Sequence, residues 1–185
     1  KNMLHRSTEL CCLIYLWWTT CLQDLFGAGT DTSSLVLEFA MAELMRTPDQ
    51  LMAKLQAEVR HGTPAGQEFV EEHNLAGMTY LKAVVKETLR LHPPAPLLLP
   101  HLAMADCDLD GYSIPSETRV IINAWAIGRD PGYWDKPDDF VPERFLEGGA
   151  AAAVDLTGKD FQFVPFGAGR RICPGLNFGL ATVEI

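Results

Sequence analysis

The residues best suited to chemistry lie in a glycine-rich segment, Phe166–Gly175, which follows the pattern F-x-x-G-x-R-x-C-x-G. Cys173 stands just before an expected helix that begins at Leu176. Free backbone N–H groups and the helix dipole at that position favour the anionic thiolate. Arg171 offers a planar fork of donors that suits a carboxylate, and the glycines allow the backbone to approach a large ligand closely. The segment therefore predicts a thiolate that acts as a ligand.

The alternative for a lone cysteine is an inert, buried thiol, because free cysteine is commonly buried. Under that interpretation the glycines and Arg171 share no purpose, whereas Arg170 is the kind of residue that is usually a surface charge. The other four cysteines form no C-x-x-C pair and no zinc spacing. A disulfide framework is thus disfavoured, and we expect a reducing compartment.

An acid followed by an alcohol, Asp31-Thr32, lies in a stretch rich in Gly, Thr and Ser (27–34) inside an otherwise good helix. Such a local departure from helix propensity is typical of a functional site. A carboxylate can relay protons and a hydroxyl can hold water, while Gly29 predicts a kink in the helix. The alternative is a solvated charge at Asp31 and a Thr32 hydroxyl that bonds back to a helix carbonyl.

Glu87 and Arg90 are spaced i, i+3 on a helix expected over Thr79–Leu91. They are predicted to lie opposite an apolar stripe that includes Val84 and Leu89. An exposed pair at this spacing would contribute little to stability.

The elements that must position these residues are mostly helical. We expect a helix over 24–45, a second that starts at Pro48 behind an N-cap Thr47 and ends near Gly62, and a third over 79–91. Short strands should follow within 109–122 around a turn at Asp110-Gly111. A mobile insertion is expected at 148–153 and a last helix from 176 onward. This order predicts a mainly α (α+β) fold with small antiparallel β-sheets.

Composition limits the function classes. With 185 residues, 48% hydrophobic and 21% charged, the chain is globular rather than disordered. A net charge of −9 disfavours a nucleic-acid surface. The apolar run Leu10–Trp18 is shorter than the roughly 20 residues that span a bilayer, and we interpret it as a buried helix turn or an abnormal splice join.

The loop around Cys173 resembles the haem-binding loop of the cytochrome P-450 superfamily. Further family motifs follow in the expected order: A-G-T-D-T-S at 28–33, E-T-L-R at 87–90, Pro100-His101, and P-E-R-F at 142–145. The flanking runs resemble plant microsomal members. The resemblance covers residues 24–185 as the C-terminal part of a haem domain truncated at both ends, and 1–23 is an atypical N-terminal segment.

The resemblance implies a cytochrome P-450 fold fragment, with helices around haem, and a role for each matching residue. Cys173 would be the axial ligand of the haem iron, Asp31 and Thr32 would guide protons to bound O2, and Glu87, Arg90 and Arg144 would form a buried structural network. The remaining implied cofactor-binding residues are Arg171, His101, Phe166, Gly169 and Gly175. The implied substrate pocket contains Ala28, Ala95, Leu97 and Leu98.

By the same resemblance, the parent protein would insert one atom of O2 into a small apolar plant metabolite. Electrons would come from NADPH through a flavoprotein reductase, at the cytosolic face of the endoplasmic reticulum membrane, with membrane contact only in a full-length form. One alternative is a truncated product that cannot hold haem. A haem-thiolate isomerase or dehydratase is a second alternative, disfavoured because the chain keeps Asp31 and Thr32.

Overall fold

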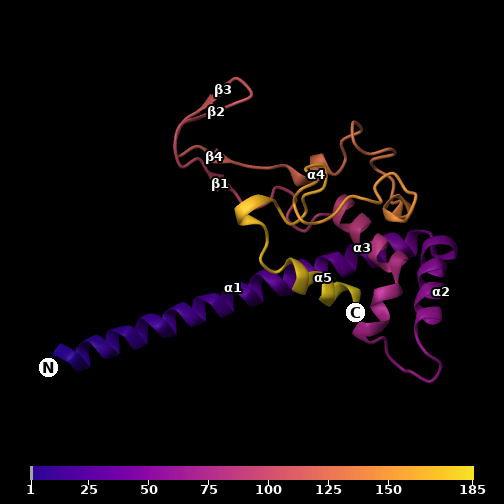
Figure 1. Cartoon of the computed structure of the whole chain (residues 1–185), viewed down its shortest axis with the longest axis horizontal. Coiled ribbons are helices and arrows are strands. Elements are labelled where there is room, and N and C mark those ends of the chain that lie inside the picture. The colour runs from indigo at the N-terminus through magenta and orange to yellow at the C-terminus, as the bar shows by residue number, and fades with distance from the viewer. Residues whose placement is uncertain (1) are drawn as a thin grey trace.

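The computed structural model describes residues 2–185, with side chains described from residue 15 onward. It is mainly helical with two small antiparallel sheets, as the sequence predicted (Figure 1). The helices are α1 (Asn2–Arg46), α2 (Ala53–Gly62), α3 (Thr79–Leu91), α4 (Ala124–Ile127) and α5 (Leu176–Glu184). The strands are β1 (His101–Leu102), β2 (Cys107–Leu109), β3 (Tyr112–Ile114) and β4 (Arg119–Val120). Shorter helical turns are Pro48–Met52, Glu72–Gly77, Pro142–Phe145 and Gly169–Arg171.

The long helix α1 differs from the prediction at its start and in its shape. It begins at Asn2 rather than at residue 24, and it runs through Gly29 without the expected kink, as one rod that extends away from the other elements (Figure 1). The hydroxyls of Thr32 and Ser34 donate to the carbonyls four residues earlier, so these poor helix formers satisfy their polar groups without leaving the helix.

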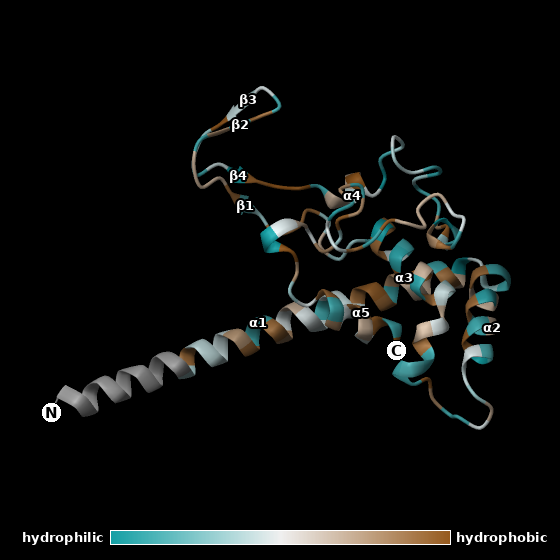
Figure 2. Ribbon diagram, viewed as in Figure 1, coloured by the Kyte–Doolittle hydropathy of each residue, from teal (hydrophilic) through white to brown (hydrophobic). Residues whose placement is uncertain are grey.

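The first part of α1 is exposed where it is described. Tyr15, Leu16, Trp17 and Trp18 are each more than half exposed, so the prediction of a buried turn is wrong for these four residues. Figure 2 shows hydrophobic positions along this projecting part of the helix. The side chains of residues 10–14 lie outside the described ones. No helix in the described part of the chain is both long and apolar enough to cross a membrane.

The core forms around α3, whose bounds are those predicted. Val84, Val85 and Leu89 are buried, and the face that carries Glu87 and Arg90 is buried as well. The apolar residues of α3 join Val36 of α1 and a cluster of aromatic rings, Trp134, Phe145 and Phe163, whose centroids are 5.4–6.1 Å apart. Phe166 and three side chains of α5 (Leu176, Leu180 and Val183) pack on the same cluster.

The helix N-terminus near residue 48 lacks the cap that the sequence predicted, and the one near residue 79 is held by a distant residue. Thr47 makes no side-chain cap bond; a π-helical turn follows it, and α2 starts only at Ala53, although it ends at Gly62 as predicted. The N-terminus of α3 is instead capped across space by Glu58, whose carboxylate accepts from the backbone N–H groups of Tyr80 and Leu81 at 2.8 Å.

The predicted hairpin is confirmed. Strands β2 and β3 pair around Asp110 and Gly111, whose φ values of 50° and 83° match the turn that such hairpins prefer. Strands β1 and β4 form the second pair, with His101 opposite Val120.

The segment 148–153 is a close-packed turn, so the prediction of a mobile insertion is wrong. Ala151 is 5% exposed, and its N–H donates to the carbonyl of Arg144 at 2.8 Å. A Cβ at Gly149 would lie 2.5 Å from two backbone carbonyl oxygens. Small residues are needed here because the chain passes so close to itself. The composition of the segment alone does not reveal this close approach.

Candidate functional site

The loop that carries Cys173 is built from left-handed glycines and one short helical turn. Gly167 and Gly169 have φ values of 73° and 68°, which residues with a Cβ rarely adopt. The N–H of Cys173 donates to the carbonyl of Phe166 at 2.9 Å, which closes the loop. Cys173 is a half-buried free thiol, two residues before Gly175, the N-cap residue of α5.

A further glycine, Gly158, which the sequence analysis missed, packs directly against this loop. Gly158 has φ +74°, and a Cβ there would lie 2.8 Å from the Cα of Ala168 and 3.0 Å from the carbonyl oxygen of Gly167. The local signal was the turn before it, in which the Asp155 carboxylate accepts from both the N–H and the hydroxyl of Thr157. That pattern predicts a turn but does not reveal what the turn packs against.

A buried charge network connects α3 to the segment 128–144. Arg90 donates to both carboxylate oxygens of Glu87 at 2.8 Å, and Arg144 donates to one of them at 3.1 Å. Glu87 is fully buried, and the N–H of Val141 gives it a further bond of 2.7 Å. Arg90 also donates to three backbone carbonyls, those of Gly128, Pro137 and Asp139. Burial of charges is tolerated only with such complete pairing.

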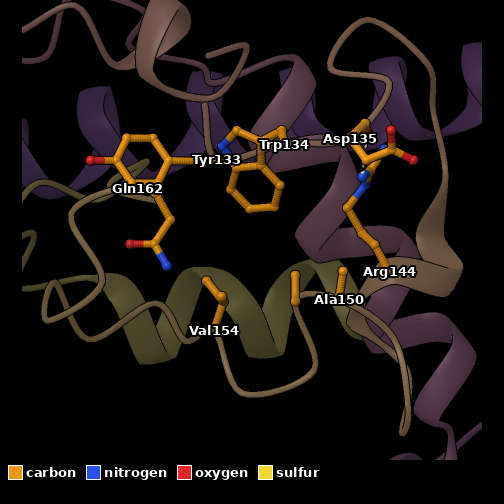
Figure 3. Close-up of a pocket in the computed structure, with 8 residues that line it drawn as sticks. Tyr133, Trp134, Asp135, Arg144, Ala150, Val154 and Gln162 are labelled. Carbon is orange, nitrogen blue, oxygen red and sulfur yellow. Dashed lines mark hydrogen bonds between the residues drawn. The ribbon is translucent and has the colours of Figure 1, made fainter. Parts of the chain in front are cut away.

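A shallow pocket lies beside this network (Figure 3). Gln162 and Arg144 stand on opposite sides of it, with Trp134 between them and Val154 along its lower edge. None of its lining residues belongs to the loop around Cys173. The pocket is therefore part of the scaffold that surrounds Arg144.

The acid–alcohol pair is exposed on α1. The Thr32 hydroxyl donates to the carbonyl of Ala28 at 2.6 Å, which is the back-bond that the alternative interpretation predicted. One turn further along, Val36 is buried in the cluster on which Phe166 and Leu176 pack. The end of the acid–alcohol stretch thus lies close to the packed side of the thiol loop, while Asp31 and Thr32 themselves face outward.

The remaining candidates are dispersed over separate elements. Leu98 comes nearest to the thiol loop: its Cδ1 lies 4.0 Å from the position of a Cβ built on Gly167. Ala95 is half-buried, whereas Leu97 and Ala28 are exposed. His101 on β1 and Arg171 in the helical turn of the thiol loop are exposed, and their side chains form no hydrogen bond or ion pair with other described residues.

Residues 18–185 match the sequence pattern of the family described as cytochrome P-450. The chain belongs to this family. It is 61% identical over 163 residues to an indole-2-monooxygenase of Zea mays, and this match covers 88% of the chain and 30% of that relative. It is 55% identical over 161 residues to a costunolide synthase of Tanacetum parthenium, over 87% of the chain and 31% of that relative.

Solved structures agree with the assignment. A zebrafish cytochrome P-450 with progesterone superposes with a TM-score of 0.75 and 38% identity, over 86% of this chain and 35% of that one. The chain therefore has the fold of part of a cytochrome P-450, and it spans about a third of the length of the relatives that it matches.

The family implies a haem cofactor, and the residues of the loop fit one. Cys173 is a half-buried thiol without a partner among the described residues, and a Cβ added at Gly169 would meet nothing within 4 Å. Open space thus lies beside the loop. No three described His, Cys, Asp or Glu side chains gather to hold a metal ion, and a thiolate-bound haem requires only one cysteine.

Proposed function

We propose that this chain forms the thiolate-bearing part of a cytochrome P-450 monooxygenase that acts on a small apolar metabolite of plant secondary metabolism. The observation that carries the proposal is Cys173, a half-buried free thiol in a glycine-bounded loop directly before α5. The names of the matched plant relatives, an indole-2-monooxygenase and a costunolide synthase, support both the reaction class and the kind of substrate.

Six residues would hold the cofactor. Cys173 would ligate the iron, Arg171 and His101 would pair with the propionates, and Phe166, Gly169 and Gly175 would shape the loop around the ring. When bound, a haem with a thiolate ligand supplies oxygen activation, because electron donation by the thiolate favours cleavage of the O–O bond. The exposed guanidinium of Arg171 and the exposed imidazole of His101 are available for such pairing.

Asp31 and Thr32 would guide protons to the oxygen-binding side of the site. The Thr32 hydroxyl would hold a water by hydrogen bonding once it exchanges its bond to the Ala28 carbonyl, and the Asp31 carboxylate would pass a proton to that water. Asp31 is exposed, so it can take up protons from solvent.

The scaffold and the substrate wall complete the proposal. Glu87, Arg90 and Arg144 would keep the segment that they connect to α3 rigid, because each buried charge is fully hydrogen-bonded. Ala28, Ala95, Leu97 and Leu98 would form part of the substrate wall.

The proposal also includes partners and location. Electrons would come from NADPH through a flavoprotein reductase, and the whole protein would work at the cytosolic face of the endoplasmic reticulum membrane. The acidic balance of the chain, with a net charge of −9, argues against nucleic acid as a partner.

The test uses a chimaera in which residues 18–185 replace the matching segment of the maize indole-2-monooxygenase. We expect the reduced carbon-monoxide complex to show the red-shifted Soret band of a thiolate ligand, and NADPH-dependent oxidation when a reductase is added. Cys173→Ser should abolish that band, whereas Cys107→Ser, at an exposed cysteine, should leave it unchanged. A Cys173→Ser chimaera that keeps the band would refute the proposal.

A further inference from the structure

Leu98 has a backbone conformation that its residue type rarely adopts. Its φ is 50°, in the left-handed region, where the Cβ of an L-residue crowds the following carbonyl oxygen. Of the four non-glycine residues with positive φ in the described chain, Leu98 alone is apolar. Such a conformation persists only where the surroundings hold it in place, and it points to a function at that position.

The turn that contains Leu98 is held from two sides. The N–H of Leu98 donates to the carbonyl of Ala95 at 3.0 Å, and the N–H of Trp125 in α4 donates to the carbonyl of Pro96 at 3.0 Å. The end of α4 is in turn fixed to the charge network, because Arg90 donates to the carbonyl of Gly128 at 2.6 Å. A continuous series of contacts thus leads from Arg90 through α4 to the turn.

The side chain of Leu98 faces the loop that carries the thiol. Its Cδ1 lies 4.0 Å from the Cβ position of Gly167, whereas its neighbours Leu97 and Leu99 are 47% and 81% exposed. Gly167 directly follows Phe166, whose carbonyl accepts the N–H of Cys173 at 2.9 Å. The left-handed turn therefore directs the middle one of three consecutive leucines onto the loop.

We propose that Leu98 is a positioning residue for the thiolate loop, and that it transmits the rigidity of the buried Glu87–Arg90–Arg144 network to Cys173. This role rests on the proposed haem-thiolate function and is additional to a place in the substrate wall. A loop built around two left-handed glycines has few side chains of its own to restrain it, so a side chain packed on it from outside limits its motion.

The first test needs no cofactor. Amide hydrogen exchange is measured in the 185-residue chain at the N–H groups of Cys173 and Gly167, which are bonded within the loop. Leu98→Ala should exchange about fivefold faster than the unmutated chain at both sites, because the packing contact is lost. Leu98→Met should restore protection, since it can reach Gly167, and Leu99→Ala, at an 81% exposed neighbour, should have no effect.

A second variant separates loss of the contact from disturbance of the turn. Glycine accepts a φ of 50° freely, so Leu98→Gly keeps the turn while it removes the same methyl groups. Faster exchange in both Leu98→Gly and Leu98→Ala, with α3 still protected, supports the proposal. Unchanged protection of Cys173 in Leu98→Gly would overturn it.

The second test uses the haem-loaded chimaera. We expect Leu98→Ala to lose the thiolate-type carbon-monoxide band about fivefold faster than Leu99→Ala on mild warming. A change in KM alone, with a stable band, would show that Leu98 only lines the substrate wall and would overturn the proposal. Absence of the band from the unmutated chimaera would instead refute the proposed haem-thiolate function. The hydrogen-exchange test in the free chain needs no haem, so it would still decide the role of Leu98.

Discussion

The buried arginine network and the acid–alcohol stretch of α1 are both motifs of polar residues on helices, yet the structure treats them in opposite ways. Glu87 has no exposure and accepts hydrogen bonds from two arginines and one backbone N–H. Asp31 and Thr32 are exposed, and the Thr32 hydroxyl bonds only within its own helix. Polar motifs on two helices thus form a buried scaffold in one place and a solvent-facing pair in the other.

The difference follows from what lies opposite each helix face. Arg90 faces the segment 128–139, which offers it three backbone carbonyls, so its charge can leave water. Asp31 and Thr32 on α1 face solvent instead, and the Thr32 hydroxyl finds its partner within the helix itself. A helix without tertiary packing is only marginally stable, so α1 should be rigid near Val36 and weak before it.

The largest effect should come from breaking the network. Arg90→Ala leaves the Glu87 carboxylate buried without its main partner, which should lower the free energy of unfolding by about 3–5 kcal/mol. Urea denaturation of the chain measures this. Arg170→Ala, at an exposed arginine, serves as the control and should change the unfolding free energy by less than about 0.5 kcal/mol. Equal effects of the two substitutions would contradict the comparison.

A smaller effect is expected where α4 meets α3. A Cβ at Gly128 would lie 2.5 Å from the carbonyl oxygen of Arg90, so Gly128→Ala should destabilise the fold by about 1–3 kcal/mol through overpacking. Gly179→Ala in α5, where nothing lies within 4 Å, is the matched control and should be neutral or stabilising by roughly 0.5–1 kcal/mol. Thermal unfolding curves compare the two, and a harmless Gly128→Ala would argue against this close contact.

The half-exposed ion pair between Lys54 and Glu143 should contribute less. Burial alone would raise the pKa of Glu143, but the hydrogen bond and the positive charge of Lys54 lower it below its usual value. A lowered folded pKa stabilises the protein above the unfolded pKa, and this contribution disappears as the pH falls through the folded pKa. Lys54→Met should therefore cost at most roughly 1 kcal/mol at neutral pH and nothing in acid. A cost that persists in acid would assign the effect to packing instead.

The smallest effect on stability is expected at Thr32. Because its hydroxyl bonds back within an exposed helix, Thr32→Ala should change the free energy of unfolding by less than about 0.5 kcal/mol. In the haem-loaded chimaera the same substitution should divert electrons to peroxide, so that less product forms for each NADPH consumed. Unchanged coupling would remove Thr32 from the proton path, and a large loss of stability would show that the outward-facing view of α1 is wrong.

Local patterns predicted the parts of the fold that depend on local interactions. The bounds of α3 and the Asp110-Gly111 hairpin were predicted because a proline stop and a two-residue turn act within a few residues. The capping of α3 by Glu58 and the packing of Ala151 were missed, because each depends on residues that the local sequence does not identify. The start of α1 at Asn2 was also missed.

In the candidate site, too, local features were predicted and long-range packing was not. The motif around Cys173 indicated a constrained loop before a helix, and its positive-φ glycines fit that prediction, while the iron ligand itself stays a prediction. Burial of the Glu87–Arg90 face could not be derived from the periodicity, which placed it opposite the apolar stripe. The approach of the Leu98 side chain to Gly167 brings together residues that are far apart in the sequence, and it left no sequence signal.

The turn at Gly158 supports the thiol loop through close backbone packing. Its backbone lies directly against Ala168 and Gly167. Screening and protonation, which weaken ion pairs, do not change the van der Waals fit between these two stretches of backbone. A residue larger than glycine at position 158 would therefore push Ala168 and Gly167 away from the turn at any ionic strength.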